Sequence, residues 1–333
     1  MGLKQKVFIG LAVSLACLAL VLKEVDFAQL WRLTVEINPL YILGVNFFLG
    51  LSFWVRSLRW RILLAPIHRC RLGSLYSANL MGFSANNLLP SRLGELVRVY
   101  ALNKMEPVPA AGVLASLVVE RLLDGITLLT VLFLALLFTD PAARAGAFSV
   151  AYLRGVGYLL LVVYVGVLAL ILALWRWPEA TAGRLTSLAG RLSPRLGEKT
   201  SGLLRAFTDG LAVLGQGRKL IPLLGLSGGV WLCFLLMYTL FLPAVGLPLN
   251  LLMGAMALAG SSLAGAVPAG PGYVGTMHLA VAWTLAMAGA DLNLALSYSF
   301  IYWAVQYFPL TLAGLFEMWR RGMSLASLRR DEH

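Results

Sequence analysis

The sequence predicts an all-α polytopic membrane protein built from two inverted-topology repeats, each with a re-entrant or broken helical hairpin. Hydrophobic residues make up 59% of the 333 residues and charged residues 13%. Soluble domains are about 25% charged and below about 50% apolar, which excludes a globular enzyme with a large core. Disorder is also excluded, because so apolar a chain cannot stay solvated.

The charge and cysteine content narrow the class of protein further. The net charge is +12, from 27 Lys and Arg against 15 Asp and Glu. Basic residues between membrane spans usually set topology, so no nucleic-acid partner is expected. The three cysteines and three histidines are scattered and form no CxxC pattern, so we expect no disulfide framework, metal site or cofactor.

Full spans are expected where an uncharged stretch approaches the about 20 residues that a helix needs to cross a bilayer. In chain order these are Val7–Leu22, Leu40–Val55, Gly155–Trp175, Leu220–Leu242 and Leu294–Phe316. The run Ala110–Phe138 has spanning length but contains three charges. We interpret the first stretch as an uncleaved helix rather than a signal peptide, because the rest of the chain is also membrane-embedded.

Two further apolar stretches are broken by proline. Ser74–Leu89 ends at Pro90 and Leu251–Val267 ends at Pro268, and each proline is followed by Gly-rich or charged sequence. The apolar character then resumes in Val274–Met287. Interrupted segments at corresponding places in two halves are typical of the binding site of a transporter.

The distribution of Lys and Arg predicts that both termini are cytoplasmic. With that orientation 19 basic residues lie inside, including those of an expected loop at 56–71, and four lie outside. Each broken pair of segments must then enter the membrane and leave it on the same side. In repeat 1–154 that side is the cytoplasmic one, and in repeat 155–320 it is the outside. Two full crossings of the membrane by each pair would place the flanking segments on the same sides, and the sequence leaves that alternative open.

The remaining parts of the chain complete one membrane domain over 1–333. The segment 181–217 is polar and carries leucines at helical spacing. We expect two short amphipathic helices on the cytoplasmic face there, beside anionic headgroups. Residues 321–333 form a cytoplasmic tail in this scheme.

The first motif that carries chemistry surrounds Pro90, which cannot continue the preceding helix. Ser91 is a suitable N-cap for a second half-helix, whose free N–H groups attract anions. Polar and charged side chains flank this break: Asn87, Ser91, Arg92, Glu95 and Arg98. We expect the amide, the hydroxyl and the two arginines to bind a phosphate, and the carboxylate to couple or gate its movement. An interfacial helix with ordinary ion pairs is the alternative.

The second motif is Glu120, Arg121 and Asp124, within the apolar run Ala110–Phe138. Glu120 and Asp124 share one helical face, and Arg121 lies three residues from Asp124. Charges at membrane depth are costly and usually functional. We expect Arg121 to bind substrate and the carboxylates to change protonation. The alternative is a structural Arg121–Asp124 pair that fixes helix packing.

The third motif, Pro268 to His278, follows Ser261 and Ser262 and is rich in glycine. Glycine permits unusual backbone angles and close approach of a ligand. We expect Ser262, Gly272 and Tyr273 to bind substrate, and a half-helix from Val274 to point its N–H groups at the arginines of the first half. A glycine hinge for close helix packing is the alternative.

These three motifs, in this order and spacing, resemble the lysylphosphatidylglycerol synthase membrane-domain family, also called flippase-like membrane proteins. The resemblance runs from about Tyr41 to Arg320. It implies movement of an anionic or aminoacylated phospholipid, or of a polyprenyl-linked carrier, between leaflets. The fused lysyl-transferase domain that some members carry is not part of the resemblance, so lipid synthesis is not expected.

We therefore expect a lipid translocase of the bacterial cytoplasmic (inner) membrane, with a phosphate-bearing lipid as its partner. A proton would couple or gate the movement. An intramembrane lipid-modifying enzyme and a non-catalytic scaffold for a cell-envelope or hopanoid synthesis complex are the alternatives. Self-association into a homo-oligomer and an envelope-synthesis partner stay open.

Overall fold

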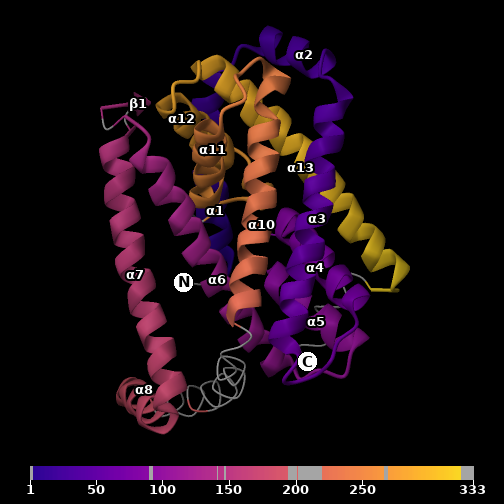
Figure 1. The fold of residues 1–333 in the computed structure, drawn as a ribbon, viewed down its shortest axis with the longest axis vertical. Coiled ribbons are helices and arrows are strands. Elements are labelled where there is room, and N and C mark those ends of the chain that lie inside the picture. Colours follow the sequence, from indigo (N-terminus) through magenta and orange to yellow (C-terminus); the bar gives the residue numbers. More distant parts are fainter. Residues whose placement is uncertain are drawn as a thin grey trace.

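The computed structural model describes residues 3–89, 93–140, 142–145, 148–193, 201, 220–265 and 269–323. These residues are helical apart from turns, short links and one small hairpin (Figure 1). The helices are α1 Leu3–Glu24, α2 Phe27–Val35, α3 Pro39–Leu64, α4 Leu72–Leu88, α5 Gly94–Met105, α6 Ala110–Leu137, α7 Val150–Arg176, α8 Pro178–Leu192, α10 Leu220–Leu240, α11 Leu251–Ala264, α12 Thr276–Met287 and α13 Leu292–Arg320. Three-residue and four-residue 3₁₀ turns cover Pro271–Tyr273 and Leu242–Val245, and strands β1 (Arg144–Ala145) and β2 (Phe148–Ser149) pair antiparallel.

Side-chain caps define where several helices begin. Asp26, Asn38, Asn250 and Asp291 stand before α2, α3, α11 and α13, and each accepts hydrogen bonds from backbone N–H groups of the first turn. Such caps satisfy donors that have no partner within the helix. All four caps therefore stabilise helix starts that local sequence alone encodes.

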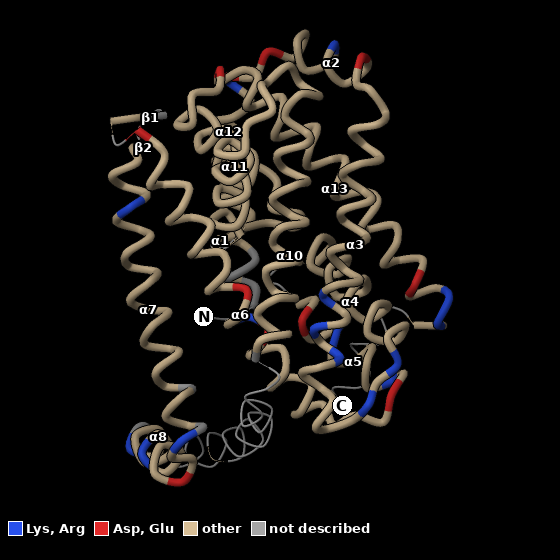
Figure 2. Tube along the Cα trace, in the orientation of Figure 1, with Lys and Arg blue, Asp and Glu red and all other residues tan. Residues whose placement is uncertain are grey.

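The described helices fit a multi-pass membrane protein. Four of them, α3, α7, α10 with its following turn, and α13, are long and apolar enough to cross a membrane, and α1 with α2 makes a fifth if that pair, bent by 89°, is one span. The 28-residue helix α6 has the required length as well but carries three charges. Figure 2 shows charged residues mostly toward the two ends of the molecule, with a further group beside α4, α5 and α6.

Two pairs of short helices lie among these long ones. α4 packs against α5, and α11 packs against α12. The α11–α12 pair lies toward the end of the molecule that holds α2, and the α4–α5 pair lies toward the opposite end (Figure 1). The turn Pro271–Tyr273, which precedes α12, packs against α4. The two pairs therefore meet inside the molecule, where α3, α10 and α13 also contact them.

The helices agree with the predicted stretches, with three differences. α3 runs to Leu64, so Arg56 and Arg59 are helical and buried rather than part of a cytoplasmic loop. The prediction of a loop from residue 56 was wrong, and these two arginines do not support the orientation. α2 was not predicted, because it has only nine residues and Gln29 and Arg32 interrupt its apolar sequence. Of the two amphipathic helices expected in 181–217, α8 is present, and the second lies outside the described residues.

Candidate functional site

A cavity of about 430 Å³ lies where the two helical pairs meet α3, α6, α10 and α13. Its volume falls in the range of about 300–1,000 Å³ that is usual for small-molecule pockets. Both halves of the chain contribute to its wall. The charged and amide residues of the wall are Arg56, Asn86, Asn87, Glu95, Arg121, Asp124 and Gln306, and the aromatic residues are Phe83, Trp231, Phe234, Tyr238, Tyr273, Trp303 and Tyr307.

The structure brings most of the predicted site residues to this cavity. Seven of them line it: Asn87, Glu95, Arg121, Asp124, Ser262, Gly272 and Tyr273. Arg98 and Glu120 are fully buried in the layer behind the wall. Ser91 and Arg92 lie outside the described residues.

Glu120 is the centre of the buried layer. Its Oε1 atom accepts hydrogen bonds from Arg56 at 2.8 Å and Arg98 at 3.1 Å, and its Oε2 atom accepts one from Arg98 at 2.9 Å. The Arg98 fork is bidentate, the strong geometry for a guanidinium on a carboxylate. Glu120 is thus bound to arginines from α3 and α5.

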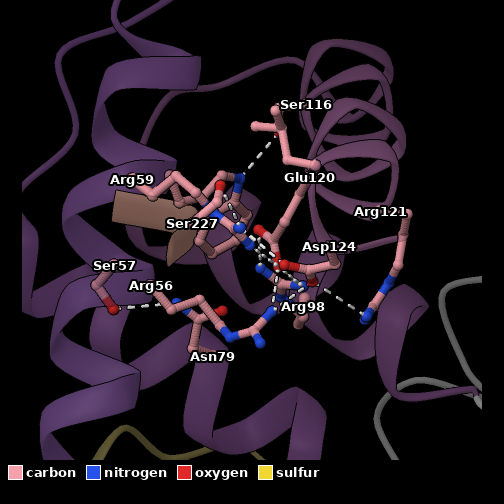
Figure 3. Close-up of polar contacts among 12 residues, drawn as sticks. Arg56, Ser57, Arg59, Asn79, Arg98, Ser116, Glu120, Arg121, Asp124 and Ser227 are labelled. Atoms are coloured by element: carbon pink, nitrogen blue, oxygen red, sulfur yellow. Dashed lines mark hydrogen bonds and ion pairs between the residues drawn. The ribbon is translucent and has the colours of Figure 1, made fainter. Parts of the chain in front are cut away.

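Asp124 stands one turn further along α6 and is bound in the same way. Arg59 donates to Asp124 Oδ1 at 2.7 Å, and Arg56 donates to Oδ2 at 3.1 Å. The indole of Trp231 on α10 lies 3.4 Å from Oδ1. Figure 3 shows the guanidinium groups converging on the two carboxylates. Since this cluster joins α3, α5, α6 and α10, it fixes the packing of four helices.

Glu95 and Arg121 form the part of the cluster that faces the cavity. The Glu95 carboxylate pairs with Arg121 and with Arg98 Nη1, the latter at 3.3 Å. The Arg121 side chain is 44% exposed and that of Glu95 is 28% exposed, whereas Arg98 and Glu120 are fully buried. Arg121 also lies 3.7 Å from Asp124. A ligand in the cavity can therefore reach this pair without disturbing the buried layer.

Among the described residues, the charges of the cluster do not cancel. Four arginines (Arg56, Arg59, Arg98, Arg121) face three carboxylates (Glu95, Glu120, Asp124), which leaves one positive charge in this part of the chain. The Phe83 ring lies under this group, with the guanidinium carbons of Arg56 at 5.0 Å and Arg121 at 6.0 Å from its centroid. Such cation–π contacts favour the charged guanidinium. The site therefore favours an anion.

The second half contributes a tight turn to the cavity wall. Gly272 has φ 68°, and a Cβ there would lie 2.8 Å from Tyr307 Cε2. Trp303 donates from Nε1 to the Gly272 carbonyl at 2.8 Å. Gly275 has φ 85° and packs against Ser14 of α1. The glycines therefore serve close packing against α13 and α1, and in doing so they bring Gly272 and Tyr273 to the cavity.

A model of one family, described as the lysylphosphatidylglycerol synthase TM region, matches residues 7–314. The chain belongs to this family. The resemblance drawn from the three motifs is thereby confirmed, and the match covers the helices and cavity residues described above. No solved structure matches the chain significantly.

Two curated proteins are similar to this family member. The glycosyltransferase AglD of Haloferax volcanii is 25% identical over 304 residues, which are 84% of this chain and 48% of that protein. A UPF0104 membrane protein of Methanocaldococcus jannaschii is 26% identical over 117 residues, 34% of this chain and 35% of its own length. The chain thus matches half or less of the length of each relative.

Two arginines of this family member were missed as site residues. The sequence predicts that Arg56 and Arg59 lie in a cytoplasmic loop, because the apolar stretch before them ends at its first charge, Arg56. Their partners, Glu120 and Asp124, are 61 to 68 positions away in the sequence. Two buried carboxylates need cationic partners. That requirement was the available signal, because Arg56 and Arg59 lie one turn apart in an otherwise apolar stretch.

The donor groups of the site favour an anion over a cation or metal ion. Among the described residues, no group of three or more His, Cys, Asp or Glu side chains is arranged to hold a metal ion. The carboxylates of the site already accept hydrogen bonds from guanidinium groups. The carboxylates that could bind a cation are therefore already bound to arginines, whereas Arg56 and Arg121 line the cavity.

Proposed function

We propose that this member of the family is a lipid translocase that moves a lipid with a phosphate-bearing headgroup between leaflets. The observation that carries the proposal is the cavity lined by Arg56, Arg121 and Glu95 inside a multi-pass membrane protein. Ionisable residues within membrane proteins usually mark substrate or ion pathways. The lipid would be an anionic phospholipid, an aminoacylated phospholipid or a polyprenyl-phosphate-type carrier.

The proposal includes the placement of the site near the middle of the membrane. Glu120 is the eleventh residue of the 28-residue α6, so apolar turns of the helix precede and follow it. The paired helices α5 and α12 have 12 residues each, about 18 Å at 1.5 Å per residue, against a bilayer core of about 30 Å. Their length supports two re-entrant pairs, and their positions support inverted repeats at 1–154 and 155–320.

The same topology assigns the two faces of the protein. In this proposal α8 and the end of α13 lie on the cytoplasmic side of the cytoplasmic membrane, and α2 lies on the opposite side. α8 carries Arg184 and Arg191, which suit an anionic inner surface. Both termini are then cytoplasmic.

The mechanism we propose is exchange at Arg121. A lipid phosphate entering the cavity replaces the Glu95 carboxylate on Arg121 and also faces Arg56. The released Glu95 takes up a proton, which keeps the charge of the cavity balanced. Glu120 and Asp124 stay bound to Arg56, Arg59 and Arg98 and hold these guanidinium groups in place. The acyl or prenyl chain remains in lipid, which lowers the cost of moving the headgroup.

A leaflet-accessibility assay in proteoliposomes tests this function. Fluorescent phosphatidylglycerol is compared with a neutral glycolipid that has the same label and chains but no phosphate. We expect the purified protein to make the inner-leaflet phospholipid accessible to an external quencher, and to leave the glycolipid at the rate of protein-free vesicles. Equal rates for phosphatidylglycerol with and without protein would rule out phosphatidylglycerol translocation, and a covalently altered lipid would favour an enzyme instead.

A further inference from the structure

The cavity has two chemically different sides. The charged side consists of Arg56, Glu95, Arg121 and Asp124. The aromatic side, which meets the charged side where the Trp231 indole lies 3.4 Å from Asp124 Oδ1, is formed by residues of α10 and α13, together with an amide: Trp231, Phe234, Tyr238, Trp303, Gln306 and Tyr307. A phosphate needs only the first side, so the second side is available for another part of the headgroup.

The aromatic side is held in place by its own contacts. Trp303 stacks on Tyr307 with ring centroids 4.5 Å apart and an angle of 24° between the planes. The Trp303 indole donates to the Gly272 carbonyl, and Tyr307 Oη donates to the Asn87 carbonyl at 3.4 Å. Because the polar tips of these rings are already hydrogen-bonded, the faces and edges of the rings are what they present to a ligand.

Gln306 lies between these two aromatic residues in the sequence and has an unsatisfied buried group. Its Oε1 atom is buried and has no hydrogen-bond partner among the described residues. Leaving a buried polar atom unpaired destabilises a protein, because the atom loses its hydrogen bonds to water. The amide end needs a partner whichever way it is oriented, and its place in the cavity wall makes a ligand hydroxyl a suitable one.

Hydroxyl groups from the second helical pair also border this side. Ser261 and Ser262 of α11 both line the cavity. Ser262 donates its proton to the Leu258 carbonyl at 2.8 Å, which leaves the hydroxyl oxygen able to accept. A ligand with several hydroxyls can donate both to this oxygen and to Gln306.

A cationic headgroup fits this side less well. Aromatic faces attract cations, but the neighbouring cluster carries one net positive charge, and its carboxylates are bound to arginines. A neutral ring with hydroxyls gains the same contacts without that repulsion.

From these observations we infer that the translocated headgroup carries, beside its phosphate, a hydroxyl-rich ring, either a sugar or a cyclic polyol. The phosphate binds Arg121 and Arg56, and the ring lies against Trp303 and Tyr307 with a hydroxyl on Gln306. This inference rests on the proposed function and specifies the class of its substrate.

Binding measured in nanodiscs tests the inference separately from transport. Intrinsic tryptophan fluorescence of the purified full chain is titrated with phosphatidylinositol and with phosphatidic acid of the same chains. A second pair, a hexosyl polyprenyl phosphate and the bare polyprenyl phosphate, distinguishes a phospholipid from a carrier lipid. We expect the member with a ring to bind about tenfold more tightly in at least one pair.

Two variants test which side of the cavity binds the ring and which side binds the phosphate. Gln306→Leu should reduce the ratio of the affinity for the ring lipid to that for its ring-free partner several-fold, and thermal unfolding of the variant reports correct folding. Arg121→Ala should weaken both members of each pair. Equal affinities within both pairs in the wild type would overturn the inference, as would an unchanged ring preference in Gln306→Leu. Phospholipid transfer without ring preference would overturn the inference alone, whereas absence of binding and transfer would count against the proposed function as well.

Discussion

Arg56 of α3 and Glu120 of α6 form a fully buried ion pair, with 2.8 Å between Nη1 and Oε1. The same nitrogen lies 3.1 Å from Asp124 Oδ2, so one guanidinium connects two successive turns of α6. Arg98 approaches Glu120 from the other side, at 2.9 Å. The two carboxylates of α6, Glu120 and Asp124, are therefore held by buried arginines, and the more exposed Glu95–Arg121 pair is the part able to exchange with a ligand.

The first prediction concerns stability. Glu120→Gln keeps the shape of the side chain but leaves four arginines facing two carboxylates. We expect the variant to lose about 3–5 kcal/mol of unfolding free energy, the usual effect of removing one partner of a buried ion pair. Denaturant unfolding in a mild detergent measures it. Glu36→Gln, at an exposed position after α2, is the control and should change stability by less than about 0.5 kcal/mol. Equal stability of the two variants would show that the cluster does not hold the helices together.

The second prediction distinguishes backbone strain from close side-chain packing at two glycines. Gly272 and Gly246 both have positive φ, at 68° and 83°, but only Gly272 has a side chain close to the position of an added Cβ. Gly246→Ala should therefore cost only the conformational strain, about 1–2 kcal/mol. Gly272→Ala should cost more and should also weaken ligand binding, because the Tyr307 ring must move. Thermal unfolding and lipid titration of both variants provide the comparison, and a smaller effect at Gly272 would contradict the described packing.

The third prediction concerns the carboxylate that competes for Arg121. If the lipid phosphate displaces the Glu95 carboxylate from Arg121, a neutral side chain of similar shape removes the competitor. Glu95→Gln should therefore bind phosphatidylglycerol several-fold more tightly than the wild type. Lipid titration in nanodiscs, with Glu36→Gln as control, measures this. Equal or weaker binding by Glu95→Gln would contradict the proposed exchange.

Much of the fold follows from physical limits that are visible in the sequence. A helix must be long and apolar to cross a bilayer, so the stretches of α1, α3, α6, α7, α10 and α13 could be recognised individually. Proline interrupts helices, which predicted where α4 and α11 end. The nine-residue α2 lacks an uninterrupted apolar run, so only its Asp26 cap marks it in the sequence, and Leu30 and Leu33 pack it against the core.

The site was predictable only in part, for a related reason. Glu120, Arg121 and Asp124 were recognised because charges inside an apolar helix are costly. The identity of their partners depends on which helices pack together, and local sequence does not contain that information. Arg56 and Arg59 therefore resembled ordinary arginines at a membrane surface, and Gln306 had no distinguishing pattern until α13 was placed beside the cavity.

The most direct test of the central claim is the transfer rate of Arg121→Ala in proteoliposomes. A hydrogen bond to a charged group contributes about 1.5–3 kcal/mol, so loss of the cavity-facing guanidinium should slow phosphatidylglycerol transfer by about tenfold or more. Arg320→Ala is the matched control, because Arg320 is a half-exposed arginine that pairs with Glu317 at the end of α13, away from the cavity wall. We expect slow transfer for Arg121→Ala and wild-type transfer for Arg320→Ala. Wild-type transfer by a folded Arg121→Ala protein would contradict it.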